Sequence, residues 1–182
     1  ILISLFGLLM IYSASYVWAE YKFDDSLKFF KTQSIFLILG YVVMFIISNI
    51  DYKKYYSKSN LIFGVCFILL ILVLIPGIGT VRNGSRSWFG IGSFGVQPSE
   101  FAKLGLIIFT AKYLAVNNKF LKSITKGVFP ILAVMFLVFG LIMLQPDFGT
   151  GMIIVVSIIA MLFIAGVNMK FFLGLGAIGV IG

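Results

Sequence analysis

Residues 61–103 read LIFGVCFILLILVLIPGIGTVRNGSRSWFGIGSFGVQPSEFAK. Residues 61–75 form an apolar run without a charged side chain, and the pair Pro76-Gly77 ends it. A glycine-rich polar loop follows, and a second apolar segment begins at Pro98, where proline suits the first position of a helix. This order of span, polar loop and span predicts helices that cross a membrane and are joined by short loops.

The composition of the whole chain agrees with that fold class. Its 182 residues are 61% hydrophobic and 11% charged, with a mean hydropathy of +1.13, whereas soluble domains carry about 25% charged residues. We therefore predict an all-α, polytopic helical membrane protein that forms a single transmembrane domain over residues 1–182. The expected spans are residues 1–18, 33–49, 61–75, 98–116, 128–144 and 151–167, with a truncated seventh from residue 171.

Both ends of the chain lie inside apolar runs, and the chain does not begin with Met. We therefore expect it to be an internal portion of a longer protein. The net charge is +8, but the basic residues lie in short loops between spans rather than on one long face, which argues against nucleic-acid binding. With no histidine and only Cys66, no zinc or haem site is expected.

The distribution of Lys and Arg predicts the orientation of the spans. Cytoplasmic loops carry an excess of these residues. One alternate set of loops holds eight of them, which are Lys53, Lys54, Lys58, Lys112, Lys119, Lys122, Lys126 and Lys170. The other set holds five, which are Lys22, Lys28, Lys31, Arg82 and Arg86, partly offset by Glu20, Asp24 and Asp25. The first set is predicted to be cytoplasmic, so the Arg82 loop and the turn at residues 145–150 share the outer face.

Glu100 and Lys103 lie at the start of the span that begins at Pro98. A carboxylate in the first turn complements the positive end of a helix, and residues three apart can pair. One interpretation is therefore a capped helix start with a local ion pair. The other is that Lys103, already one turn inside an apolar helix, faces a cavity or a partner, as charges within membranes usually do.

Arg82 and Arg86 lie in a loop that contains several glycines. A guanidinium suits phosphate and carboxylate, and glycines let backbone amides approach an anion. The loop is therefore a candidate site for an anionic headgroup at the outer membrane surface. Alternatively, Trp88 and the arginines anchor the loop at the interface, where aromatic and basic residues commonly gather. The residues alone support both interpretations.

Asp147 lies in the short turn QPDFGTG, residues 145–151, between two apolar spans. Its side chain can cap the following helix, and Gly149 permits an unusual backbone angle. The functional alternative is that Asp147 meets Arg86 or Lys103 across the outer face, because a carboxylate so close to the membrane should have a partner.

Three segments carry a resemblance to a known family. They are LISLFGLLMIYSAS at residues 2–15, IPGIGTVRNGSRSWFGIGSFGVQPSEFAKL at residues 75–104 and LQPDFGTGMIIVVSIIAMLFIAGV at residues 144–167. In this order they resemble the SEDS proteins, the family of FtsW, RodA and SpoVE. The form NGSRSW at residues 83–88 looks more like the FtsW and SpoVE branch than like RodA.

The resemblance implies a fold of about ten helices, of which this chain is the amino-terminal portion. It also implies a peptidoglycan glycosyltransferase that polymerises lipid II at the outer face of the bacterial cytoplasmic membrane, for division, sporulation or shape. In such an enzyme a sugar hydroxyl attacks an anomeric carbon, undecaprenyl pyrophosphate leaves, and an acidic residue is the general base. Residues that match family motifs, and are therefore expected to support catalysis or bind substrate, are Arg86, Trp88, Glu100, Lys103 and Asp147.

The catalytic residue itself is not expected in this chain. The family's proposed aspartate lies in a later outer loop with a motif like H-T-D-F, and this chain has no histidine. It is therefore expected beyond residue 182, and the portion is expected to be inactive alone. Magnesium or manganese is a candidate cofactor that would steady the pyrophosphate, although no metal ligand is predicted here. The implied partners are lipid II, a class B penicillin-binding protein and membrane lipid.

Two other functions are compatible with the sequence. A flippase or transporter of lipid-linked precursors is one, because transporters also place charges beside broken helices. The predicted cytoplasmic loops are simple Lys anchors, which counts against substrate contact on both faces. A scaffold that only recruits a penicillin-binding protein is the other.

Overall fold

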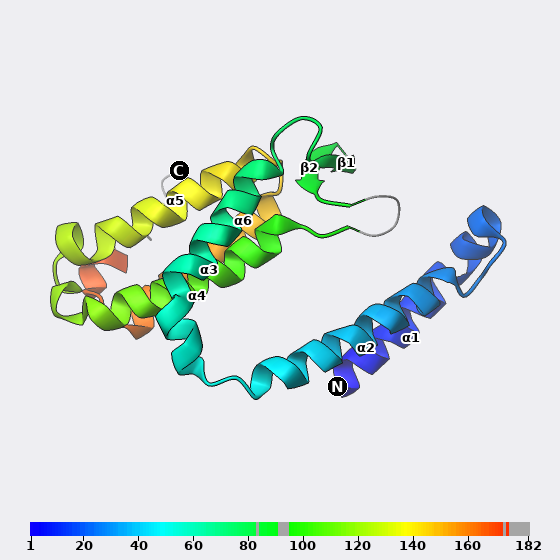
Figure 1. Ribbon diagram of the computed structural model, residues 1–182, viewed down its shortest axis with the longest axis horizontal. Helices are drawn as coiled ribbons and strands as arrows, with labels where there is room; N and C mark the ends of the chain where they lie inside the picture. Colours follow the sequence, from blue (N-terminus) through cyan, green and yellow to red (C-terminus); the bar gives the residue numbers. More distant parts are fainter. Residues whose placement is uncertain (83, 91–94, 173, 175–182) are drawn as a thin grey trace. The chain divides into compact units, whose positions relative to one another are not determined.

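The structure is a computed structural model that describes residues 1–82, 84–90, 95–172 and 174; of Arg82 only the backbone is described. The chain divides into two compact units, Ile1–Tyr52 and Lys53–Gly182, which we call the N-terminal unit and the C-terminal unit (Figure 1). Each is considered by itself. The single transmembrane domain over residues 1–182 stays a prediction.

The N-terminal unit is an antiparallel pair of helices, α1 (Leu2–Phe23) and α2 (Lys28–Ser48) (Figure 1). Asp24 ends α1 in the left-handed conformation, with φ of 54°, and its N–H donates to the carbonyl oxygen of Glu20 at 3.0 Å. The two helices contact each other through aromatic side chains. The rings of Tyr12 and Phe30, for example, meet edge to face with centroids 5.8 Å apart.

Apolar side chains cover both helices of the N-terminal unit on nearly all sides. Among the described residues of α1 and α2, only Ala19 is buried. Large side chains such as Ile38 and Val17 are more than half exposed. A helix that is apolar all round belongs in the interior of a large protein or in a bilayer. These helices are therefore suited to lipid, and to contact with further chain.

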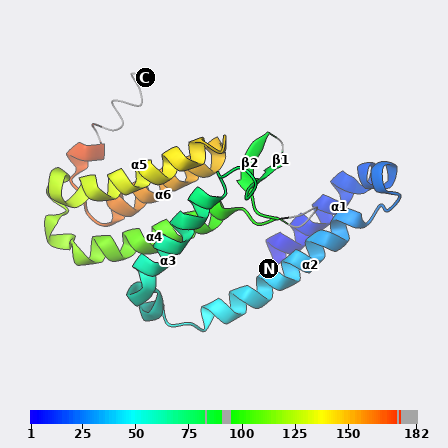
Figure 2. The same ribbon diagram turned by 45° about the horizontal axis from the view of Figure 1, so that its top comes forward.

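The C-terminal unit contains the remaining helices and a small hairpin. Its elements are α3 (Tyr52–Leu72), β1 (Thr80–Arg82), β2 (Ser85–Trp88), α4 (Pro98–Val116), a 3-10 turn at Asn118–Phe120, a π-helical turn at Ile124–Val128, α5 (Phe129–Met143) and α6 (Phe148–Ile164). Helices α4, α5 and α6 run side by side (Figure 2). Their facing side chains make the core, which includes Leu106, Ile131, Met135, Val138, Ile154 and Ile158.

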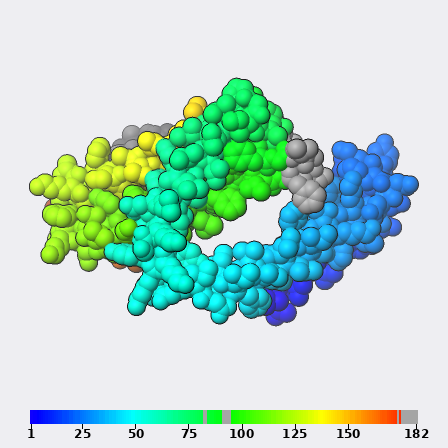
Figure 3. All heavy atoms as spheres, in the orientation of Figure 1, coloured from blue at the N-terminus to red at the C-terminus, as the bar shows by residue number. Residues whose placement is uncertain are grey.

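Helix α3 packs on the outside of this bundle, against α4. The rings of Phe63 and Phe109 stack with centroids 4.9 Å apart. A Cβ atom at Gly105 of α4 would lie 3.2 Å from Sγ of Cys66, so the small residue allows a close approach of the two helices. In the space-filling view, side chains of α3 lie against those of α4 (Figure 3).

The helical membrane fold is confirmed. Four helical segments among the described residues are long and apolar enough to cross a membrane: α1, α2, α3 and residues 124–143. Helix α6 is apolar but shorter, with 17 residues. Helix α4 has 19 residues but carries Glu100, Lys103 and Lys112. The predicted seventh span, from residue 171, lies largely outside the described residues.

The helices extend beyond the predicted spans at several ends: α1, for example, ends at Phe23 rather than residue 18. Helix α3 begins at Tyr52, well before the predicted residue 61, and α2 begins at Lys28 rather than residue 33. Both extensions contain Lys, which favours helices, and long Lys side chains carry their charge to water beyond an apolar span. Hydropathy therefore locates the spans but understates the length of the helices.

Candidate functional site

A short antiparallel hairpin sets the first part of the candidate site. Strands β1 and β2 pair Val81 with Arg86, and Gly84 makes the turn between them with φ of 81°, which favours glycine. The hydroxyl of Thr80 donates to the carbonyl oxygen of Trp88 at 3.0 Å. The hairpin thus fixes the backbone at Arg86 and Trp88, two of the predicted site residues.

Arg86 lies partly buried on β2. A Cβ atom at Gly79 would overlap the carbonyl oxygen of Val73 and lie 2.9 Å from Cγ of Arg86, so only glycine leaves room for this side chain. The Nε atom of Arg86 is buried and has no hydrogen-bond partner among the described residues. A buried guanidinium donor without a partner costs free energy, and an anion would satisfy it.

The start of α4 supplies the second part. Pro98 occupies the first turn, as predicted, and Gln97 is the N-cap residue. Lys103 Nζ lies 2.7 Å from Oε2 of Glu100, which confirms the predicted ion pair. The Lys103 side chain is 18% exposed and that of Glu100 is 51% exposed, so the ammonium is the more enclosed partner.

The turn between α5 and α6 supplies the third part. Asp147 is the N-cap residue of α6, and its Oδ1 accepts from the N–H of Thr150 at 3.1 Å, which confirms the predicted cap. Its Oδ2 accepts from Nε2 of Gln97 at 2.7 Å. The alternative interpretation, in which Asp147 meets Arg86 or Lys103, is not observed: neither forms an ion pair with it in the described part of the chain. Asp147 instead accepts a hydrogen bond from the Gln97 amide, and Lys103 forms its ion pair with Glu100.

Gly149 also behaves differently from the prediction. It lies within the first turn of α6 and is not among the glycines with positive φ in the described residues. The sharp change of direction therefore occurs before it, and Gly149 is an ordinary helical residue.

Hydrogen bonds bring these three parts together at one end of the C-terminal unit. The hydroxyl of Ser85 on β2 donates to the backbone carbonyl oxygen of Gln145. The bond between Gln97 and Asp147 joins the starts of α4 and α6. The hairpin that contains Arg82 and the turn at residues 145–150 thus lie at one end of this unit, and the placement of that end at the outer face stays a prediction.

Sequence reasoning missed Gln97 and Gln145 as members of the site. A signal for them existed, because each stands in a Gln-Pro pair near the start of a helix: Gln97 is the N-cap residue of α4, and Gln145-Pro146 precedes Asp147, the N-cap residue of α6. Only the fold shows that the two helices begin side by side.

Several polar side-chain atoms at this end are buried but have no hydrogen-bond partner among the described residues. The Gln145 side chain is fully buried, and neither its Oε1 nor its Nε2 has a partner among the described residues. The same holds for the hydroxyl of Ser99, in the first turn of α4. Buried polar groups are normally paired, so such a set marks a place where polar ligand atoms or further chain would fit.

The described residues do not supply a full set of protein ligands for a divalent cation. The described residues contain no group of three His, Cys, Asp or Glu side chains that could hold an ion. Glu100 is engaged by Lys103, and Asp147 is engaged by Gln97. A cation therefore stays a prediction, and no catalytic step is assigned to it here.

Comparison with known proteins gives consistent matches over the whole chain. The sequence model of the cell cycle protein family FtsW/RodA/SpoVE matches residues 1–182. Stage V sporulation protein E of Bacillus subtilis is 51% identical over 176 residues, covering 97% of this chain and 48% of that protein. A probable peptidoglycan glycosyltransferase FtsW of Saccharophagus degradans is 39% identical, covering all of this chain and 47% of that protein.

Solved structures agree with the sequence matches. A chain from a study of how a peptidoglycan synthase complex coordinates polymerization and crosslinking has a TM-score of 0.70 at 26% identity, covering 97% of this chain and 51% of that chain. The rod shape determining protein RodA of Thermus thermophilus has a TM-score of 0.63 at 26% identity, covering 96% and 58%. The chain spans about half the length of the relatives it matches. It belongs to the FtsW/RodA/SpoVE family of cell cycle proteins, and its greater identity to SpoVE and FtsW is consistent with that branch.

Proposed function

We propose that this chain is part of a peptidoglycan glycosyltransferase that polymerises lipid II into glycan strands. The observation that carries the proposal is the family match over all 182 residues. Relatives that this chain resembles are named as probable peptidoglycan glycosyltransferases. The site supports it, because the residues that match family motifs gather at one end of the C-terminal unit.

The proposed role of this end is to bind and orient the anionic part of the lipid substrate. Arg86 holds a buried, unpaired N–H among the described residues, and Lys103 holds an enclosed ammonium against Glu100. Fixed cationic donors stabilise negative charge that develops on a leaving pyrophosphate. Asp147 acts as a positioning residue in this proposal, because it caps α6 and ties it to α4 through Gln97.

The general base is proposed to come from a part of the protein outside these residues. Glu100 is paired with Lys103 and half exposed, and Asp147 serves as a helix cap. Neither is offered as the group that removes the proton from the attacking sugar hydroxyl. A divalent cation would need oxygen ligands from the substrate in addition to these carboxylates.

Further parts of the proposal concern location and partners. The positive-inside rule would place the hairpin end at the outer face of the bacterial cytoplasmic membrane. A class B penicillin-binding protein is the proposed partner, since a similar chain comes from a complex that coordinates polymerization and crosslinking.

The test is a polymerisation assay on the full-length protein with its partner and lipid II. Wild type should give glycan strands, whereas Glu100→Ala, Lys103→Ala and Asp147→Ala should give less product. Normal product from all three variants would remove these residues from the mechanism. Wild-type protein that moves lipid II across a vesicle without making glycan would instead support a transporter. Loss of synthesis only through substitutions on the lipid-facing helix surface would support a scaffold.

A further inference from the structure

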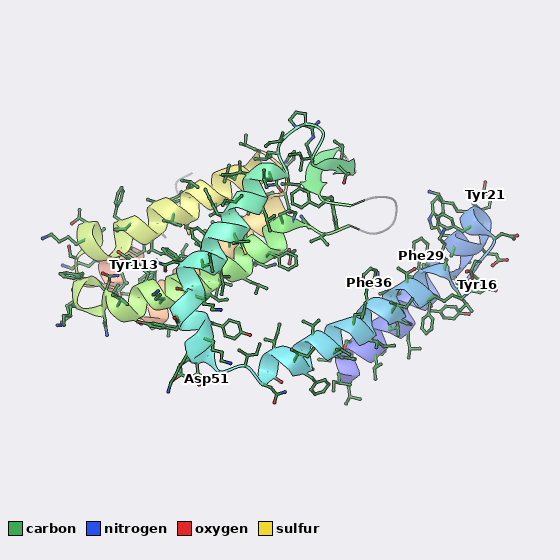
Figure 4. All side chains as sticks on the ribbon, in the orientation of Figure 1. Tyr16, Tyr21, Phe29, Phe36, Asp51 and Tyr113 are labelled. Atoms are coloured by element: carbon green, nitrogen blue, oxygen red, sulfur yellow. The ribbon has the colours of Figure 1, made fainter. Side chains whose placement is uncertain are left out.

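A second polar site lies at the opposite end of the C-terminal unit, between α3 and α4. A pocket of about 260 Å³ is lined by Asn60, Phe109, Lys112, Tyr113, Val116 and Asn117. Tyr113, labelled in Figure 4, marks its place on α4, far from the β1–β2 hairpin within the same unit. None of these residues takes part in the candidate site described above.

The charge in the pocket comes from Lys112. Its Nζ lies 3.4 Å from Oδ1 of Asn60, a long hydrogen bond, and 5.5 Å from the ring centroid of Tyr56. No carboxylate forms an ion pair with Lys112 among the described residues. The ammonium therefore keeps donors for an anion, with the amide groups of Asn60 and Asn117 close by.

The other wall of the pocket is apolar. Phe109 stacks on Phe63 of α3, and Val116 is 61% exposed at the end of α4. Helix α3 is long and apolar enough to cross a membrane, so this apolar wall can meet lipid hydrocarbon. A pocket lined by both polar and apolar side chains fits a molecule that has a charged head and a hydrocarbon tail.

The surroundings of the pocket are strongly basic. Residues 52–126 contain one acidic side chain, Glu100, which lies at the far end of α4. Six further lysines lie in the part of α3 before Asn60 and in the segment after α4, and they are Lys53, Lys54, Lys58, Lys119, Lys122 and Lys126. A second carboxylate, that of Asp51, lies directly before α3. Basic pockets between membrane helices bind anionic lipid headgroups.

We propose that this pocket binds the phosphate headgroup of an anionic phospholipid, with Lys112 as the ligand to the phosphate and Phe109 and Val116 beside the acyl chain. The volume is several times the ~30 Å³ of a water molecule and suits a small headgroup. A free phosphate compound shares the headgroup chemistry but would gain nothing from the apolar wall. The proposal does not depend on the glycosyltransferase activity.

The test is native mass spectrometry of the full-length protein in detergent, with phosphatidylglycerol or phosphatidylcholine added. Wild type should retain phosphatidylglycerol in preference, and Lys112→Gln should weaken that retention about fivefold to tenfold, the effect of one lysine near an anionic lipid. Lys119→Gln is the matched control, because it removes the same charge from an exposed residue that does not line the pocket. Lys112→Arg should restore retention.

Each other outcome overturns the proposal. Equal losses in Lys112→Gln and Lys119→Gln would mean general attraction to a basic surface. Equal retention of the two lipids would mean that the pocket does not select charge. Displacement of phosphatidylglycerol by inorganic phosphate would identify a soluble phosphate ligand. If Lys112→Gln does not fold, Val116→Phe tests the same site by filling it with its charge intact, and unchanged retention would overturn the proposal.

Discussion

The two units are built from similarly apolar helices, yet one has a core and the other has almost none. In α1 and α2 of the N-terminal unit only Ala19 is buried among the described residues. In the C-terminal unit, α4, α5 and α6 each contribute a row of buried side chains. Apolar composition therefore makes a helix suitable for the bilayer. Packing against other helices determines which of its faces is buried in protein.

The ion pairs of the two units differ in the same way. Lys31 and Asp25, 3.0 Å apart, are 59% and 40% exposed. Lys103 and Glu100, 2.7 Å apart, are 18% and 51% exposed. An exposed pair contributes little to stability, whereas an enclosed ammonium near a membrane span needs a reason to be there. The difference points to function in the C-terminal unit.

The largest expected effect comes from a cavity in the core of the C-terminal unit. Ile158→Ala, at a residue with no exposed surface, should lower the free energy of unfolding by about 2–3 kcal/mol, the lower part of the range for such truncations. The lower part applies because lipid also solvates the exposed side chain after unfolding, so mainly packing is lost. Unfolding of the full-length protein in detergent measures it. Ile38→Ala on α2, where the side chain is 62% exposed, is the control. An equal loss of stability there would contradict the difference in burial between the two units.

Two glycines, one in each unit, differ in the space around their backbone. A Cβ atom at Gly127 would overlap the carbonyl oxygen of Phe120, whereas one at Gly40 of α2 would meet nothing within 4 Å. Gly127→Ala should cost about 1–2 kcal/mol of stability because the backbone must shift. Gly40→Ala should be neutral or stabilising by up to about 1 kcal/mol, since alanine favours a helix. The same unfolding assay checks both, and a stabilising Gly127→Ala would contradict the structure.

The cap of α6 gives a smaller effect. Asp147→Ala removes the acceptor for the N–H of Thr150 and for the side chain of Gln97. The loss of an N-cap costs about 1 kcal/mol. Asp147→Asn keeps a capping oxygen and should retain most of the stability, so the two variants should differ in melting temperature. Identical melting temperatures would show that the cap does not stabilise α6.

The smallest effect is expected at the exposed pair of the N-terminal unit. The hydrogen bond from Lys31 lowers the pKa of the Asp25 carboxyl below its ordinary value. A lowered pKa means that the charged form stabilises the fold, fully above the ordinary pKa of about 3.9 and progressively less as the pH falls through the lowered pKa. Asp25→Asn should therefore be slightly less stable than wild type at neutral pH, and the difference should vanish in acid. A difference that grows on acidification would contradict this sign.

The sequence predicted the helices because their apolar runs are long and their ends carry strong signals. Pro98 and Asp147 mark the starts of α4 and α6, and both act as predicted. The polar start of α3 and the π-helical turn before α5 were not predicted, since neither has a hydropathy signal. The hairpin was predicted only as a loop, because its strands have three and four residues.

The contacts of the candidate site were predicted where they are local in sequence and missed where they join distant parts of the chain. Lys103 and Glu100 lie one turn apart on one helix, so local geometry predicts their pair. Asp147 and Gln97 are 50 residues apart in sequence, and only the packing of α4 against α6 brings them together. The functional roles of Arg86, Trp88, Glu100, Lys103 and Asp147 stay predictions.

We propose that substrate chemistry depends on the enclosed pair of the C-terminal unit, Lys103 and Glu100, and not on the exposed pair of the N-terminal unit, Lys31 and Asp25. The most direct test compares Lys103→Gln with Lys31→Gln in the lipid II polymerisation assay, using full-length protein that folds equally well in both variants. We predict at least a tenfold loss of rate for Lys103→Gln, about 1.4 kcal/mol in the barrier, and a rate within about twofold of wild type for Lys31→Gln, as for an exposed pair. Equal rates in the two variants would contradict the account.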